Sequence, residues 1–400
     1  MPRISKLLPT LTKQQARRIW LNAQRLDVAA PFGSGPEATR EAVEHLGYVQ
    51  IDTINVIERS HHHILFTRIP DYRREHLHRA QTIDKTVFEY WTHALAYVPT
   101  RDIRFFLGEM KRYRQSPNPW FGTVTRKELR RVLTLVQTDG ALTIRDIEDD
   151  VLVEKIHAWA SRKPSKRALQ LAFYRGDLTI SERRGMLKTY ELMERHFGWK
   201  IRPKPAPERE VLDYLLDRAL RSQGIVSLDS ACHLNAPRKP GIRRAIEARI
   251  RRKELVPIDV EGAGKNEHWA RPEVLDSLPD TGNELVHILS PFDPLVIQRK
   301  RLRMFFDYDH RFEAYVPKEK RLFGYFALPV LVDDRIVAAI DLKTDRQKGK
   351  LLIQKWNWVG KGKPRMHKAR IEGELHRFER FQLGAPAPTA PPDEEGLLTR

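Results

Sequence analysis

The chain has 400 residues, more than one hydrophobic core usually holds, so we expect about two to four domains. Its 71 Lys and Arg residues exceed its 52 Asp and Glu residues, and the net charge of +19 favours a nucleic-acid partner, although composition leaves DNA, RNA and the ribosome open. The single cysteine, Cys232, excludes an internal disulfide and a multi-cysteine zinc site, and no apolar run reaches the ~18 residues of a membrane span. We therefore expect a cytoplasmic protein.

The first part of the chain, to about residue 115, is predicted to be mainly helical. Thr12 is placed to cap a helix that runs to Leu26, and a second helix follows the turn at residues 33–36. We expect that helix to end at Leu46, because Gly47 suits the backbone conformation of a C-cap.

The segment directly after this helix, residues 48–53, reads YVQIDT. If it is extended, its period of two places Gln50 and Asp52 on one face, while the apolar residues beside them anchor the segment in the core. A carboxamide and a carboxylate on one face suit catalysis. From these residues alone a structural role is favoured instead, with Asp52 capping a helix from Thr53 and Gln50 exposed on a strand.

The middle of the chain contains a repeated order of elements: a helix, a short capped helix, a basic helix and a β-hairpin. In the first copy, a helix over residues 127–137 precedes a short helix capped by Thr143. A basic helix over residues 164–174 follows, and residues 178–182 and 187–191 have the pattern of a hairpin.

The second copy begins with a helix over residues 208–221 and a short helix capped by Ser227. A strongly basic helix over residues 243–253 precedes two strands, at 255–260 and 267–270. This order is typical of the winged helix-turn-helix, although mixed α/β chains also produce it by chance.

The last quarter of the chain is richer in β-strand patterns. Strands are predicted at residues 323–332, 335–341 and 351–359, within a small β-rich domain. The Pro- and Ala-rich residues 384–392, with their acidic sequel, predict a disordered tail.

Several long and uncommon motifs resemble a known enzyme family, the AlkZ/YcaQ-type winged-helix DNA glycosylases that act in crosslink repair. The motifs lie in the family's order, at residues 50–68, 89–93, 290–296, 299–301 and 323–329. The run Gln50-Ile51-Asp52 resembles the Gln-aliphatic-Asp motif of the YcaQ branch, whereas the AlkZ branch has a second Gln in place of Asp52.

The resemblance implies an α+β fold, in which a C-shaped array of three winged-helix motifs precedes a β-rich, barrel-like domain. We accordingly expect a divergent winged-helix domain with the catalytic motif at residues 1–117. Winged-helix domains are expected at 118–203 and 204–283, the barrel-like domain at 284–383 and the disordered tail at 384–400.

The resemblance also implies hydrolysis of the N-glycosidic bond of N7-alkylated purines and unhooking of DNA interstrand crosslinks. An N7-alkylated purine is cationic and leaves without an acid, so Asp52 is expected to stabilise the oxocarbenium-like sugar and to activate water. Gln50 is expected to position the water or the sugar. We predict a monofunctional enzyme without a Schiff-base lysine, a cofactor or a metal ion.

Candidate DNA contacts are basic and histidine side chains, which the net charge makes about as likely to touch phosphate as to lie on a solvated surface. They are Arg59, His61, His62, His63, Arg183, Arg184, Arg299, Lys300 and Arg301. Ser60 is expected to cap a helix that carries the three histidines, for which a plain core or surface position is favoured over DNA contact. The hairpin at residues 183–184 is a candidate minor-groove probe. Tyr90 and Trp91 are expected to pack in a buried helix.

Two other functions fit the charge: a non-enzymatic winged-helix DNA-binding protein or transcriptional regulator, and an RNA-binding protein. A regulator usually adds a ligand or dimerisation domain, and the sequence contains no clear one. We expect a monomer that binds alkylated or crosslinked double-stranded DNA, has no membrane contact and is associated with the nucleoid.

Overall fold

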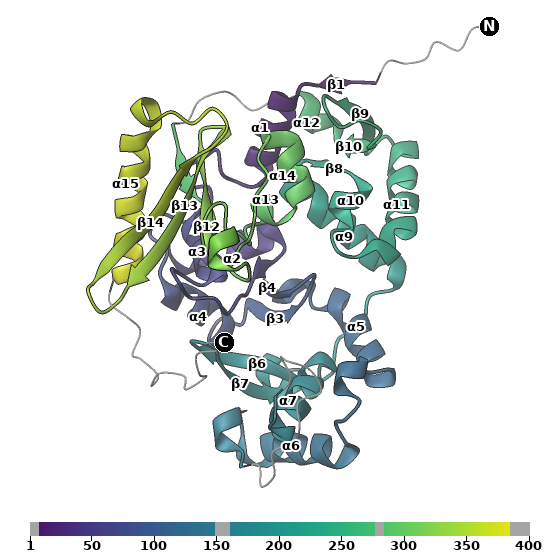
Figure 1. Cartoon of the computed structure of the whole chain (residues 1–400). Helices are drawn as coiled ribbons and strands as arrows, with labels where there is room; N and C mark the ends of the chain where they lie inside the picture. Colours follow the sequence, from purple (N-terminus) through teal and green to yellow (C-terminus); the bar gives the residue numbers. More distant parts are fainter. Residues whose placement is uncertain (1–7, 149–160, 277–283, 385–400) are drawn as a thin grey trace, which may run out of the picture.

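The computed structural model describes residues 8–148, 161–276 and 284–384 (Figure 1). Helices and four small β-sheets alternate along these ranges, which confirms the predicted α+β class. None of the helices in the described ranges has both the length and the apolar character needed to cross a membrane. The predicted tail at 384–400 lies outside the described residues, except for Gly384.

Three segments share one order of elements: helix, short strand, one or more helices, and hairpin. We call residues 35–99, 126–192 and 208–270 the first, second and third units. The first unit contains α2 (Gly35–Leu46), β2 (Val49–Gln50), α3 (Ser60–Phe66), α4 (Arg74–Thr82), β3 (Val87–Trp91) and β4 (Leu95–Pro99).

The second and third units repeat this order with different helix lengths. The second contains α6 (Arg126–Asp139), β5 (Leu142–Thr143), η3 (Ile144–Asp146), α7 (Pro164–Tyr174), β6 (Leu178–Arg184) and β7 (Leu187–Leu192), and α8 (Met193–Phe197) follows it. The third contains α9 (Glu208–Gln223), β8 (Ile225–Val226), α10 (Leu228–Ala231), η4 (Ala236–Arg238), α11 (Lys239–Arg251), β9 (Val256–Val260), β10 (His268–Ala270) and the following α12 (Pro272–Asp276).

The sheets of the three units also share one strand order. In each, the short first strand pairs with the second strand of the hairpin, which gives β2-β4-β3, β5-β7-β6 and β8-β10-β9. Between the first two units lie η1 (Thr100–Asp102), α5 (Arg104–Gln115) and η2 (Pro119–Phe121). The rings of Phe105 and Tyr214 stack at 4.1 Å and join α5 to the third unit.

Local capping explains where several of these elements begin and end. Thr12, Thr143 and Ser227 each accept a backbone N–H at the start of their helix, as predicted. Gly47 ends α2 with φ +77°, and a side chain at this position would collide with Arg218. This sharp stop starts the β2 segment directly after α2.

The predicted buried helix around Tyr90 and Trp91 is wrong. Both residues lie in β3, which pairs with β4, so their side chains point to opposite faces. Tyr90 is buried, whereas Trp91 is 47% exposed. The first unit is therefore less helical than expected.

The N-terminal elements pack mainly against later parts of the chain. Strand β1 (Thr10–Leu11) pairs in parallel with β9 of the third unit, and α1 (Lys13–Ala23) packs against α9 and against α14 (Arg299–Phe306). Trp20 of α1 is fully buried there. Residues 10–23 therefore contact elements that lie about 200 to 300 residues later in the sequence.

The C-terminal domain is an open sheet covered by a helix. Its elements are β11 (Val286–Ile288), α13 (Pro294–Ile297), α14 (Arg299–Phe306), η5 (Lys318–Lys320), β12 (Ala327–Val332), β13 (Arg335–Asp345), β14 (Lys350–Trp358) and α15 (Pro364–Leu383). Strands β11 and β14 are the two edges of this antiparallel sheet, so the expected barrel-like closure is wrong. Figure 1 shows α15 beside the sheet.

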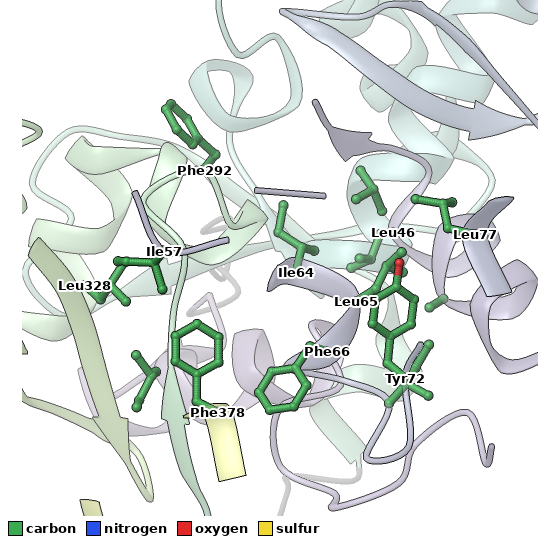
Figure 2. Packing of buried hydrophobic residues seen from close by; sticks show 14 of the residues in the cluster. Leu46, Ile57, Ile64, Leu65, Phe66, Tyr72, Leu77, Phe292, Leu328 and Phe378 are labelled. Atoms are coloured by element: carbon green, nitrogen blue, oxygen red, sulfur yellow. The ribbon is translucent and has the colours of Figure 1, made fainter. Parts of the chain in front are cut away.

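One hydrophobic core joins the first unit to the C-terminal domain. Figure 2 shows Ile64, Leu65 and Phe66 of α3 among residues from α2, β12 and α15. Phe378 of α15 is fully buried and stacks on His63 of α3 at 4.6 Å. Strand β2, which carries Gln50, is therefore supported by a core that the first unit and the C-terminal domain share.

Candidate active site

The segment that carries Gln50 is anchored in the first sheet. Val49 pairs with Tyr97 and Gln50 pairs with Ala96, and the N–H of Ile51 donates to Leu95 O at 2.8 Å. Val49 and Ile51 are buried in the core shared with the C-terminal domain, as the predicted alternation requires.

Gln50 is only 6% exposed, and its side chain is held from the β3–β4 turn. Its Oε1 lies 3.0 Å from Nε2 of His93. Its backbone carbonyl accepts the hydroxyl of Ser60 at 2.7 Å. Ser60 is thus the first residue of α3 and not its cap, and it ties the helix to β2.

Asp52 lies just beyond the end of the strand. Its Oδ1 accepts the N–H of Ile54 at 2.8 Å, and no helix begins at Thr53, so the predicted helix-capping alternative is wrong. Burial raises the pKa of the Asp52 carboxyl, and the N–H groups of Ile54 and Thr53 partly offset this. Such a carboxylate is a stronger base than one in water.

The C-terminal domain fixes the chain that follows Asp52. Arg346 donates to the carbonyls of Asn55 and Ile57 at 3.2 and 2.7 Å, and the N–H of Thr344 donates to Val56 O at 3.0 Å. The Tyr315 ring is 73% exposed, and the nearby charge of Asp52 contributes, after burial, to the raised pKa of this phenol. Asp52 therefore lies where the first unit meets the C-terminal domain.

The expected DNA contacts at His61–His63 gain no support. His61 and His63 are each 1% exposed, and Nδ1 of His62 lies 2.7 Å from the hydroxyl of Tyr72. In the described part of the chain, no group of three or more potential ligand residues is placed to hold a metal ion.

Two buried histidines, His63 and His287, and the half-buried His45 join separate parts of the chain through carbonyl oxygens. Nε2 of His45 lies 2.7 Å from Ala23 O, and Nε2 of His63 lies 2.7 Å from Ile288 O. Nε2 of His287 lies 2.8 Å from Leu26 O. Burial lowers the pKa of each of these histidines to about 4, although the carbonyl contact acts in the opposite direction.

These histidines predict a loss of stability in mild acid. Below pH ~6.5 the unfolded chain protonates them while the folded chain keeps them neutral, so the free energy of unfolding should fall by roughly 1.4 kcal/mol per pH unit for each. Urea unfolding at pH 7 and pH 5 measures this. In the variant His287→Gln, the free energy of unfolding should depend less steeply on pH, because unfolding takes up about one proton fewer. An unchanged slope would contradict the role given to His287.

Arg183 does not reach the surface as a minor-groove probe would. It is 8% exposed, and its guanidinium donates to Glu89 of β3 at 2.8 and 2.5 Å. A Cβ on Gly185, at the hairpin turn, would lie 3.8 Å from Arg59 of the first unit. The hairpin therefore docks the second unit on the first, and Arg184 is its exposed basic side chain.

Arg301 is also buried, at 5% exposure. It donates to Ile225 O at 2.7 Å, and its guanidinium lies 4.5 Å from the Trp20 ring centroid. Arg299 is half-buried over Phe312, whereas Lys300 is exposed. We therefore keep Lys300 as a candidate phosphate contact, together with Arg184, which would have to exchange its ion pair with Glu182, but not Arg183 or Arg301.

Two residues beside the site were not linked to it by sequence reasoning. His93 was interpreted with Tyr90 and Trp91 as part of the core, with base stacking as the minor alternative, although a turn between two strands would have placed it against β2. Tyr315 lies in the connection between α14 and β12, and no local pattern links it to Asp52, which is more than 250 residues away.

Comparison with known protein families gives the class of protein. Residues 43–381 match the family model described as DNA glycosylase AlkZ-like, so the chain belongs to the AlkZ-like DNA glycosylases. Among solved structures, the chain is similar to the DNA glycosylase AlkZ of Streptomyces sahachiroi, with a TM-score of 0.61 and 18% sequence identity. The similarity covers 93% of this chain and 97% of that one, and at this identity it shows a shared fold. The family resemblance and the enzyme class are confirmed.

Proposed function

We propose that this DNA glycosylase hydrolyses the N-glycosidic bond of N7-alkylated purines in double-stranded DNA and unhooks interstrand crosslinks formed through that position. The observation that carries the proposal is the half-buried carboxylate of Asp52, which has a raised pKa and lies two residues after the side chain of Gln50. Both residues fall within the range that matches the family.

The chemistry needs a base but no acid. Alkylation at N7 gives the purine a positive charge, so the electron pair of the C1′–N9 bond neutralises the ring as the bond breaks. Asp52 stabilises the positive charge that develops on the sugar, and it takes a proton from the water whose oxygen bonds to C1′. Gln50 holds the water or the sugar in place. The products are the free base and an abasic site.

The three units support a winged-helix array. Their common strand order places a short strand beside a hairpin and a helix pair, as in winged helix-turn-helix domains. Part of the basic charge of α11 is not free for DNA: Arg243 pairs with Glu267, and Arg249 is buried and pairs with Asp217. Arg244 is exposed and makes no ion pair within the described residues, so it is the first candidate of α11 for phosphate.

A duplex with a single N7-methylguanine tests the function. Purified protein should release free N7-methylguanine and leave an abasic strand that breaks only after alkali. Borohydride should trap no enzyme–DNA adduct, because water and not a lysine attacks C1′. Tight binding without base release would contradict the proposal and favour a non-enzymatic DNA-binding protein. A crosslinked duplex in a parallel reaction tests unhooking separately.

A further inference from the structure

We infer that His93 is a positioning residue, which holds the carboxamide of Gln50 by its oxygen and leaves the amide nitrogen to the substrate. This inference rests on the proposed function, since it assigns a role to a neighbour of Gln50.

The β-hairpin of the first unit places His93 over Gln50. Trp91 pairs with Leu95, and the N–H of Thr92 donates to Ala94 O at 2.8 Å, so the chain reverses tightly around His93. Strand β4 of this hairpin also pairs with β2. The imidazole therefore projects from the turn to the end of β2, and its Nε2 lies 3.0 Å from Oε1 of Gln50.

Aromatic neighbours from two units fix the plane of the His93 ring. Tyr48 lies edge-on at 5.0 Å between centroids, and His233, which follows α10 in the third unit, lies edge-on at 5.3 Å. Arg218 of α9 lies over the Tyr48 ring at 5.5 Å. Because the ring is held on several sides, its hydrogen bond can fix the carboxamide orientation.

The ring is neutral under ordinary conditions. Burial lowers the pKa of His93 to about 3, and the charges of His233 and Arg218 add to this effect. With Oε1 of Gln50 facing the ring, the Nε2–H of the neutral imidazole is the donor.

The other end of the carboxamide stays available. In the part of the chain that the structure describes, Nε2 of Gln50 makes no hydrogen bond, and it is not one of the buried atoms that lack a partner. It therefore keeps contact with solvent and offers N–H donors. Gln50 therefore donates to an oxygen, of the attacking water or of the sugar, and does not accept a hydrogen bond from the substrate.

A double-mutant cycle on single-turnover base release tests this role. His93→Ala should slow release by about 10- to 100-fold, since a displaced positioning group has effects of this size. The same substitution in a Gln50→Ala background should cause almost no further loss, because its partner is already gone. Losses that multiply in the double variant would overturn the inference.

Two further variants separate positioning from packing. His93→Phe keeps an aromatic ring between Tyr48 and His233 but cannot donate, so it should be as slow as His93→Ala with unchanged DNA affinity and thermal midpoint. A His93→Phe enzyme as fast as wild type would overturn the inference. His376→Ala, at an exposed histidine of α15, is the control and should match wild type. If Gln50→Ala itself is fully active, the proposed site fails, which is a different result from an additive cycle.

Discussion

Replacing Asp293 with alanine is expected to lower the free energy of unfolding by about 3–5 kcal/mol, the range found when one partner of a buried ion pair is removed. Asp293 and Arg68 are both fully buried, and the guanidinium donates to the two carboxylate oxygens at 2.7 and 3.0 Å. Arg68 also donates to both oxygens of Gln24 at 3.0 Å and to Ile64 O at 3.2 Å. The variant leaves a buried charge without its counterion at the junction of three chain segments.

Urea unfolding of matched variants measures this effect. Glu267→Ala breaks the exposed ion pair with Arg243 and should change stability by no more than about 1 kcal/mol. The double variant Arg68→Met with Asp293→Leu removes both charges and should lie closer to wild type than Asp293→Ala does. Equal stability of Asp293→Ala and Glu267→Ala would contradict the role of the buried pair.

The substitution Asp52→Asn is expected to slow base release by about 100- to 10,000-fold, the usual contribution of a general base. The amide keeps an oxygen that can accept the N–H of Ile54, so the local chain should stay folded. DNA affinity should stay near wild type, because the substitution removes no cation from the phosphate-binding surface.

Asp102→Asn is the matched control for this experiment. Asp102 is another carboxyl whose pKa is raised by burial, but it lies in η1 beside Tyr214. Its replacement should leave the release rate near that of wild type. A similar loss of rate in both variants would mean that buried carboxyls stabilise the fold without acting in the reaction.

Local signals in the sequence predicted many elements and their ends. The range predicted for α7 agrees with the structure, because Pro164 suits the first turn and Gly176 lies just beyond the end. Thr12 and Gly47 were also placed correctly, since capping depends on the nearest few residues. The two hairpins of the second and third units were found from their alternating strands.

Features that depend on distant partners were not predictable. Arg183, His63 and Arg301 were predicted to contact DNA, but each is buried and makes a hydrogen bond to a residue at least 76 positions away. The helix α15 was missed because residues 284–381 were assigned to strands as a whole. At the site, alternation correctly predicted the anchoring of residues 49 and 51. It could not show that Asp52 lies beyond the end of the strand, where its carboxylate accepts the N–H of Ile54.

The central claim is that the carboxylate of Asp52 performs the chemistry, and the pH dependence of single-turnover base release tests it most directly. Because burial raises the pKa of Asp52 above its usual value, the wild-type rate should increase with pH through that raised pKa and then level off. Asp52→Asn should be slow and should lack this increase over the pH range in which circular dichroism shows both proteins folded. An Asp52→Asn enzyme that keeps the wild-type rate or the same ionisation would contradict the account.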